Sequence, residues 1–336
     1  MKIETYVHEE DKINQYLNFF KRHYPEQQLN QHVSQIKKLL DKKNPFFKNG
    51  ELINFLAKEK DNVLGHCSAI LDKRNKDVGL IGFYDCVEDI DVNNELLKNC
   101  INWLNKKGCS KIRGPINLSI WNNYRFVIEN KRNLEIFDPI SKKYYVKFWE
   151  SKGFNISKKY ISAIRSNFTK IISDTEKDHF QLNEKGYTIR SFNTKNPFED
   201  LERIWHLSNE IFLKSWNFVP LTFKEFMYIY DDIIESVDLS LSEIVEDLNA
   251  NPVGFCFTLI NPDNNKQLIL KTLGVLPEHR QKGIANALVH SQHIKASEKK
   301  FLEFYYPLIN QENNISKMSK EDCDIITEYA TFELIL

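Results

Sequence analysis

The chain has 336 residues, enough for about two domains of ordinary size with real hydrophobic cores. Lysine plus arginine and aspartate plus glutamate number 46 each, so no overall charge favours nucleic acid or an anionic membrane as a partner. The N-terminal stretch is charged throughout, and no apolar run is long enough to cross a bilayer. We therefore expect a cytoplasmic protein with neither a membrane nor a nucleic-acid partner.

The cysteines support the same compartment. They show neither C-x-x-C pairs nor zinc-type spacing, and several lie in apolar runs: Cys67, Cys86, Cys100, Cys109, Cys256 and Cys323. Such residues are typical of buried free thiols in a reducing compartment.

The first half of the chain shows the order helix, three strands, helix, strand. Apolar residues recur at helical spacing over 13–40 and 93–107, and Gly108 follows as a helix end. The predicted strands are 52–58, 62–71, 78–87 and 109–116.

A polar stretch separates the two halves. Residues 167–185 are charged, with only scattered apolar side chains, which is typical of a linker. We predict a first domain over 1–170, a linker over 171–185 and a second domain over 186–336.

The second half repeats the order of the first. Helical spacing covers 198–212, 223–234 and the stretch after 283, and the predicted strands are 187–192, 239–245, 252–260, 268–275, 301–306 and 325–336. The repetition indicates two copies of one α/β unit.

The stretch 273–288, LGVLPEHRQKGIANAL, predicts a strand, a tight turn and a helix. Pro277 cannot donate to a sheet and ends the strand, and Gly283 and Ala285 remove bulk where the helix begins. The unpaired amides of a helix start carry partial positive charge, so residues 281–285 are suited to grip a diphosphate. Arg280 and Lys282 add full positive charges.

Residues 280–285, RQKGIA, resemble the R/Q-x-x-G-x-G/A signature of the GCN5-related N-acyltransferases, the GNAT superfamily. The bland alternative is a glycine used only for close helix packing. The resemblance implies an α/β (α+β) fold of two tandem GNAT-like units, each a mixed, largely antiparallel sheet flanked by helices. It also implies acetyl-CoA or another acyl-CoA as co-substrate, with no metal. The cofactor-binding residues that it implies are Leu273, Gly274, Val275, Arg280, Gln281, Lys282, Gly283, Ile284 and Ala285.

The first copy lacks this turn. Between its third strand and its helix it has Val87-Glu88-Asp89-Ile90-Asp91, and carboxylates at a helix start repel a diphosphate. Its other motifs, which lie at 44–47, 79–84, 113–117, 144–145 and 150–154, resemble large two-domain GNAT-like proteins that mostly have no assigned substrate. We expect a structural or acceptor-shaping role for this half.

Transfer of an acyl group to an amine requires a donor for the developing oxyanion and a proton source for the leaving thiolate. The resemblance implies a backbone N–H near 273–275 for the first, and for the second a tyrosine after an asparagine that meets the pantetheine arm. Asn313 or Asn314 fits that asparagine, but 315–324 contains no tyrosine. Tyr305, Tyr306 and Tyr329 are the substitutes. Glu303, or water relayed from Glu243, is the candidate base.

The loop at 214–220 is aromatic, and in the GNAT fold this loop helps to shape the acceptor pocket. Trp216 and Phe218 are candidate lining residues, with a hydrophobic plug as the equal alternative. A metal site at His279, His290 and His293 is disfavoured, since neither a carboxylate nor a cysteine completes it.

Three functions remain open on the sequence. The first is an acyl-CoA-dependent N-acyltransferase acting on a small-molecule or peptide amine. The second is a non-catalytic acyl-CoA-binding or scaffold protein. The third is an aminoacyl-tRNA-dependent transferase, which the cationic turn and the lack of a basic stripe disfavour.

Overall fold

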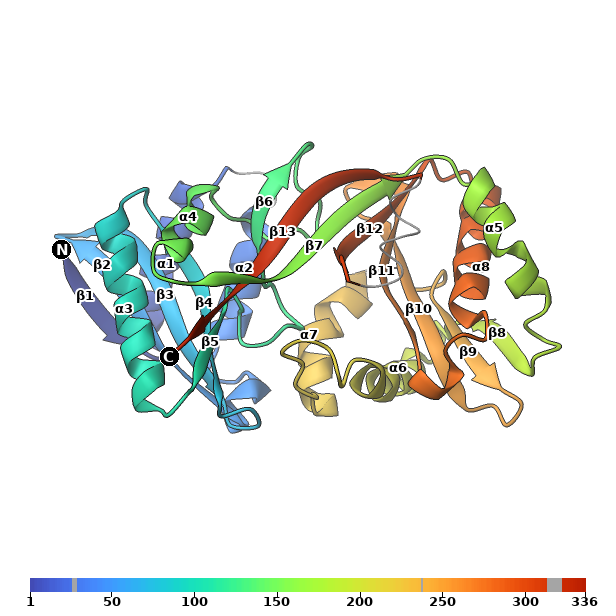
Figure 1. Ribbon diagram of the computed structural model, residues 1–336, viewed down its shortest axis with the longest axis horizontal. Coiled ribbons are helices and arrows are strands. Elements are labelled where there is room, and N and C mark those ends of the chain that lie inside the picture. The colour runs from blue at the N-terminus through green and yellow to red at the C-terminus, as the bar shows by residue number, and fades with distance from the viewer. Residues whose placement is uncertain (26–28, 237, 313–321) are drawn as a thin grey trace. The chain divides into compact units, whose positions relative to one another are not determined.

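The computed structural model describes residues 1–25, 29–236, 238–312 and 322–336 (Figure 1). The chain forms two units. Unit 1 comprises Met1–Tyr160 and Thr327–Leu336, and unit 2 comprises Ile161–Ile326. The chain passes between the units inside strand β7 (Asn155–Arg165) and again inside strand β13 (Asp324–Ile335). None of the described helices is both long and apolar enough to span a membrane.

Unit 1 is a mixed sheet with helices. Its strands run in the order β1-β2-β3-β4-β5-β13, and β6 pairs with β13. Pairing is antiparallel from β1 to β4 and parallel between β4 and β5. The elements are β1 (Lys2–Tyr6), α1 (Glu10–His23), α2 (Leu29–Leu40), η1 (Pro45–Lys48), β2 (Gly50–Glu59), β3 (Asn62–Asp72), β4 (Val78–Cys86), α3 (Ile90–Lys106), β5 (Lys111–Gly114), β6 (Phe126–Asn130) and α4 (Tyr144–Glu150).

Unit 2 repeats this arrangement. Its strands run in the order β8-β9-β10-β11-β12-β7, antiparallel from β8 to β11 and parallel between β11 and β12. The elements are α5 (Thr169–Phe180), β8 (Tyr187–Ser191), α6 (Pro197–Ile211), α7 (Phe223–Ser236), β9 (Glu243–Asp247), β10 (Pro252–Asn261), β11 (Asn264–Val275), η2 (Pro277–His279), α8 (Ile284–Glu298) and β12 (Glu303–Asn310). The prediction of two copies of one mixed α/β unit is confirmed.

The core of unit 1 is built by α3 against the sheet. Leu96, Cys100 and Leu104 repeat at helical spacing. They pack with Cys67 and Ala69 of β3, and all five residues are fully buried. The cysteines of the chain are free thiols, and five of the six are buried. Burial of these apolar side chains is the main source of stability for the unit.

The predicted linker is where the structure differs most from the sequence interpretation. Residues 169–180 form helix α5, which lies beside α8 (Figure 1). Its buried face carries only Ile171 and Thr175 among many charged residues, so the apolar periodicity is too thin to be recognised in the sequence. In addition, residues 327–336, which we assigned to the second domain, belong to unit 1.

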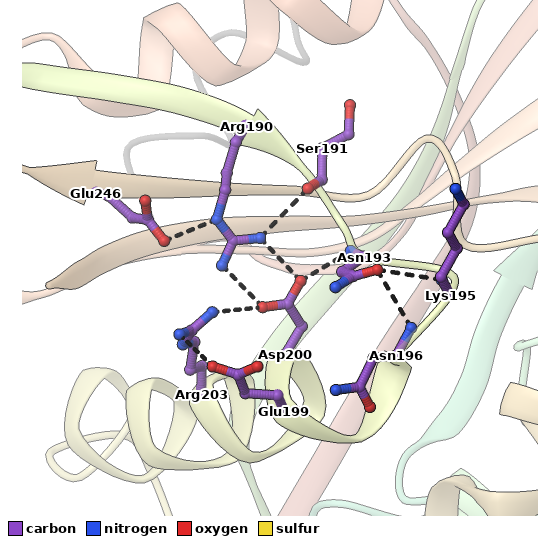
Figure 2. A network of polar contacts seen from close by, with 9 residues as sticks. All are labelled: Arg190, Ser191, Asn193, Lys195, Asn196, Glu199, Asp200, Arg203 and Glu246. Carbon is purple, nitrogen blue, oxygen red and sulfur yellow. Dashed lines mark hydrogen bonds and ion pairs between the residues drawn. The ribbon is translucent and has the colours of Figure 1, made fainter. Parts of the chain in front are cut away.

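A polar network joins β8 to α6 in unit 2 (Figure 2). The Asp200 carboxylate is 1% exposed and accepts two hydrogen bonds from Arg190, each of 2.8 Å, one of 3.0 Å from Arg203 and one of 2.8 Å from the amide of Asn193. Burial alone would raise the pKa of Asp200, but these donors outweigh it and hold the pKa below its usual value.

We expect Asp200→Asn to lower the free energy of unfolding of unit 2 by about 2–3 kcal/mol at neutral pH, because the Arg190 guanidinium loses its bidentate partner. Since the folded-state pKa of Asp200 is lowered, its contribution is present above about pH 4 and is lost as the pH falls through the folded-state value. Urea unfolding at neutral and acidic pH measures both effects. Glu199→Gln, at an exposed pair with Arg203, is the control and should cost under about 0.5 kcal/mol.

Candidate functional site

The turn between β11 and α8 has the geometry that the sequence predicts. The strand ends at Val275, the short helix η2 follows at Pro277, and α8 begins at Ile284. Gly283 is the residue before the helix and has a φ of +86°, a left-handed conformation that favours glycine. A residue with a side chain at this position would be strained, so glycine is required by the turn itself.

The amides at the start of α8 are unpaired within the described part of the chain. Within the described part of the chain, no hydrogen-bond acceptor is recorded for the backbone N–H groups from Gln281 to Asn286. Unpaired amides at a helix start concentrate partial positive charge. This is an arrangement that binds phosphate in proteins.

The two cations of the turn hold its shape. The Arg280 guanidinium donates from Nε to the carbonyl oxygen of Val275 at 3.0 Å and from Nη2 to that of Ile211 at 3.3 Å. The Lys282 ammonium donates to the Tyr187 hydroxyl at 3.0 Å, which also bonds to His279 Nδ1 at 2.9 Å. Both charges therefore lie at the turn and are anchored to neighbouring elements.

A carboxylate lies against the same turn. A Cβ atom placed on Gly283 would collide with Oδ1 of Asp178, which belongs to α5. Oδ2 of Asp178 accepts from Asn286 Nδ2 at 2.7 Å, and Oδ1 accepts from Lys185 Nζ at 3.4 Å. Sequence reasoning missed Asp178, because it lies about a hundred residues from the turn in the stretch that we interpreted as a linker.

Strands β11 and β12 part next to the turn. They pair only over Gln267–Ile269 and Glu303–Tyr305, so β11 has no β12 partner from Leu270 onward among the described residues. The amide of Leu276 bonds to Val253 of β10, and backbone groups alternate along a strand. The amides of Val275 and Leu273 therefore point to the side on which β12 has parted. Neither amide has a β12 partner among the described residues.

The counterpart in unit 1 is closed. Strands β4 and β5 also pair over only three positions, but Ile116 then donates to the carbonyl oxygen of Ile81 at 2.8 Å. The amide of Phe83 donates to Asn117 Oδ1 at 2.7 Å. At the start of α3, the Asp89 carboxylate accepts from the amides of residues 91 and 92. These amides of unit 1 thus have acceptors from the chain itself.

The candidate catalytic side chains bond to neighbouring groups, and only Tyr305 of the three is fully buried. Tyr305 is 0% exposed and donates to Ser162 Oγ at 3.1 Å. The Tyr306 hydroxyl bonds to His293 Nε2 at 2.5 Å, and burial raises its pKa. Glu303 accepts from Gln267 Nε2 at 3.2 Å. The raised pKa makes the Tyr306 phenol a weak proton donor. The assignment of Tyr305, Tyr306 and Glu303 stays a prediction.

The other candidates are dispersed. Tyr329 is buried in unit 1 and donates to Asp138, and the Glu243 carboxylate is buried against Lys295. Trp216 and Phe218 are half-buried in the loop after α6, where the Phe218 ring lies 6.4 Å from that of Phe212. Asn313 and Asn314 lie outside the described residues. The acceptor-pocket and pantetheine assignments therefore stay predictions.

The three histidines near the turn have separate partners. His279 bonds to Tyr187, the His290 ring stacks on that of His179 with 4.6 Å between centroids, and His293 bonds to Tyr306. Over the described residues, no group of three or more His, Cys, Asp or Glu side chains is placed to hold a metal ion.

Comparison with known proteins gives a sequence relative and many structural ones. No family model matches the chain. The sequence is similar to Protein YghO of Escherichia coli strain K12, with 26% identity over 219 residues, which cover 62% of this chain and 54% of that protein. The chain thus spans about half the length of this curated relative.

The structural relatives agree on the fold. A tandem GNAT protein from the clavulanic acid biosynthesis pathway matches with a TM-score of 0.58 and 11% identity over 99% of this chain and 98% of that one. GCN5-related N-acetyltransferases match from Sphaerobacter thermophilus (TM-score 0.57, 11% identity, 99% and 95% of the two chains) and Anabaena variabilis (0.56, 10%, 99% and 73%). Both units and their order in the chain are covered by these matches. The chain is therefore a large two-domain protein with the tandem GNAT fold.

Proposed function

We propose that this protein is an acyl-CoA-dependent N-acyltransferase that uses acetyl-CoA, or another acyl-CoA, to acylate an amine. Unit 2 is the catalytic unit in this proposal. The observation that carries it is the conjunction of unpaired amides at the start of α8 with the parting of β11 from β12 along the end of β11. The first suits the diphosphate of CoA, and the second gives the pantetheine arm a place between two strands.

The proposal assigns roles to the backbone and to few side chains. The amides of Gln281–Ala285 bind the diphosphate, and an N–H of Leu273 or Val275 polarises the thioester carbonyl. The acceptor amine is a small molecule or a peptide, and Trp216 and Phe218 line its pocket. Unit 1 has a closed counterpart and a structural or acceptor-shaping role. Free buried thiols agree with a reducing compartment, and we propose the cytoplasm.

Two measurements on the full chain test this function. Isothermal titration with acetyl-CoA is expected to give saturable binding of one ligand per chain, and a panel of amines with thiol detection is expected to give CoA release with at least one acceptor. Acetyl-pantetheine, which lacks the diphosphate, is the control ligand and should bind far more weakly. Equal affinity for the two ligands would contradict the assigned cradle.

A non-catalytic acyl-CoA-binding protein is the second candidate. It is favoured by the partners of the two phenols, since the buried Tyr305 donates to Ser162 and the half-buried Tyr306 bonds to His293. Binding of acetyl-CoA without release of CoA across a broad amine panel would favour this candidate over the enzyme.

A further inference from the structure

Helix α5 is fixed along α8 by contacts on both sides of its buried face. The His290 ring bonds through Nδ1 to the carbonyl oxygen of Ile172 at 3.0 Å, and His179 Nδ1 bonds to that of Ala287 at 3.3 Å. The two imidazole rings stack, and Thr175 is buried beside them. The position of α5, and of any side chain that it carries toward the start of α8, is thus determined by packing rather than by an exposed loop.

Asp178 is the side chain that α5 carries to this place. Its carboxylate lies over Gly283 and is held by Asn286 Nδ2 at 2.7 Å, on the first turn of α8. Lys185 Nζ lies 3.4 Å from the carboxylate and 3.2 Å from the carbonyl oxygen of Lys282. A negative group at a helix start is stabilised by the helix dipole, so the carboxylate is stable at this position when no other anion is present.

We propose that Asp178 is a resident competitor of the ligand's diphosphate and sets the affinity of unit 2 for acyl-CoA. This inference rests on the proposed function. The donors that hold the carboxylate, which are Asn286 and Lys185, are donors that a diphosphate beside Gly283 would use. A diphosphate must therefore displace the carboxylate or bind beside it, and either outcome weakens binding because two anions repel at short range.

The competition explains how the two features of the turn coexist. The amide cradle with its anchored cations attracts an anion, while the Asp178 carboxylate repels the same anion. Removal of one charge from the chain, without change of shape, should thus strengthen binding of a ligand with a diphosphate. It should leave binding of acetyl-pantetheine unchanged, because that ligand has no phosphate near the carboxylate.

The test is isothermal titration of the full chain with acetyl-CoA for the wild type and for Asp178→Asn. Asparagine keeps the size of the side chain and can still bond to Asn286, so α5 should stay in place. We expect acetyl-CoA to bind about tenfold more tightly to the variant at low salt, as for removal of one partly exposed like charge, and the gain to shrink at high salt. Asp174→Asn is the matched control, since Asp174 is exposed one turn earlier on α5 and should leave the affinity unchanged.

The outcomes separate this inference from the proposed function. If the wild type binds acetyl-CoA and Asp178→Asn binds it equally or more weakly, Asp178 only joins α5 to α8 and the inference is overturned. If Asp178→Asn strengthens acetyl-pantetheine as much as acetyl-CoA, the effect does not pass through the diphosphate and the inference is equally overturned. If neither protein binds acetyl-CoA, the proposed function fails and the inference fails with it. Binding by the variant alone would support both.

Discussion

Replacement of Gly283 by aspartate is expected to weaken acetyl-CoA binding at least about a hundredfold, because the new carboxylate would face the diphosphate at the start of α8. Two further effects act in the same direction. A side chain at φ +86° is strained, and its Cβ would collide with Oδ1 of Asp178, so the Asp178 side chain or the turn must shift. Isothermal titration of the variant beside the wild type measures the loss.

Backbone strain must be separated from loss of the cradle. Gly108 at the end of α3 has a φ of +84°, and a Cβ there would meet no heavy atom within 4 Å. Gly108→Asp therefore introduces the same residue in the same backbone conformation, but in unit 1 rather than in the turn of unit 2. We expect acetyl-CoA to bind this control as it binds the wild type.

If the Gly283→Asp protein bound acetyl-CoA with wild-type affinity, the result would contradict the proposed position of the diphosphate at the start of α8. Hydrogen exchange of the α8 and β10 peptides, compared between the variant and the wild type, shows whether unit 2 stays folded. Loss of binding together with loss of protection in β10 would reflect unfolding, and in that case Ala285→Asp, beyond the strained residue, is the variant to measure.

Local patterns in the sequence were sufficient to predict most elements. The apolar spacing of 93–107 predicts α3 because Leu96, Cys100 and Leu104 all face one core. The proline and glycine of the 273–288 stretch predict the turn because proline cannot donate to a sheet and glycine tolerates a positive φ. The repeated order of elements predicts two units because each sheet needs the same helices to cover it. These signals are local, so the sequence carries them in plain form.

The rest depends on contacts between distant residues. Asp178 reaches Gly283 across about a hundred residues, and no pattern in either segment refers to the other. Arg280 was predicted to add charge beside a phosphate, and the structure shows that its guanidinium also holds the carbonyl oxygen of Val275. Likewise, the closure of unit 1 depends on Asn117, an ordinary polar residue whose role follows only from the place where β4 and β5 part.

The acidic residues of unit 1 show both cases. The carboxylates before α3 predict that the helix start is occupied from within the chain, and Asp89 does accept two of its amides. Asp85, only four residues earlier, gives no such signal. It lies in a run that predicts a strand, and only the fold brings three tyrosines to its side chain.

Asp85 is the buried centre of that cluster, and the stability of unit 1 is expected to depend on its proton. Its side chain on β4 accepts from the hydroxyls of Tyr16 and Tyr24 at 2.6 Å each and from that of Tyr145 at 3.5 Å. Burial raises the pKa of Asp85 from 3.8 to about 7, while the tyrosine hydroxyls and the charge of Lys142 act in the opposite direction.

The sign of the pH dependence follows from this shift. The folded protein keeps a proton on Asp85 at pH values where the unfolded chain has lost it, so the contribution to stability is complete below about pH 4. It is then lost as the pH rises toward about 7, by about 4 kcal/mol in all, since one unit of pKa corresponds to about 1.4 kcal/mol. Wild-type unit 1 should thus weaken from mildly acidic to neutral pH.

Asp85→Asn removes this proton and keeps the shape of the side chain. The difference in unfolding free energy between Asp85→Asn and the wild type should move by about 4 kcal/mol in favour of the variant between about pH 4 and about pH 8. Urea unfolding with hydrogen exchange of β4 peptides measures unit 1, and β10 peptides serve as the internal reference. Asp61→Asn, in the exposed turn between β2 and β3, is the control and should show no such movement. If the unfolding free energy of Asp85→Asn kept a constant difference from that of the wild type over this range, as expected for Asp61→Asn, the Asp85 carboxyl would titrate alike in the folded and unfolded chains. Burial would then not govern its charge.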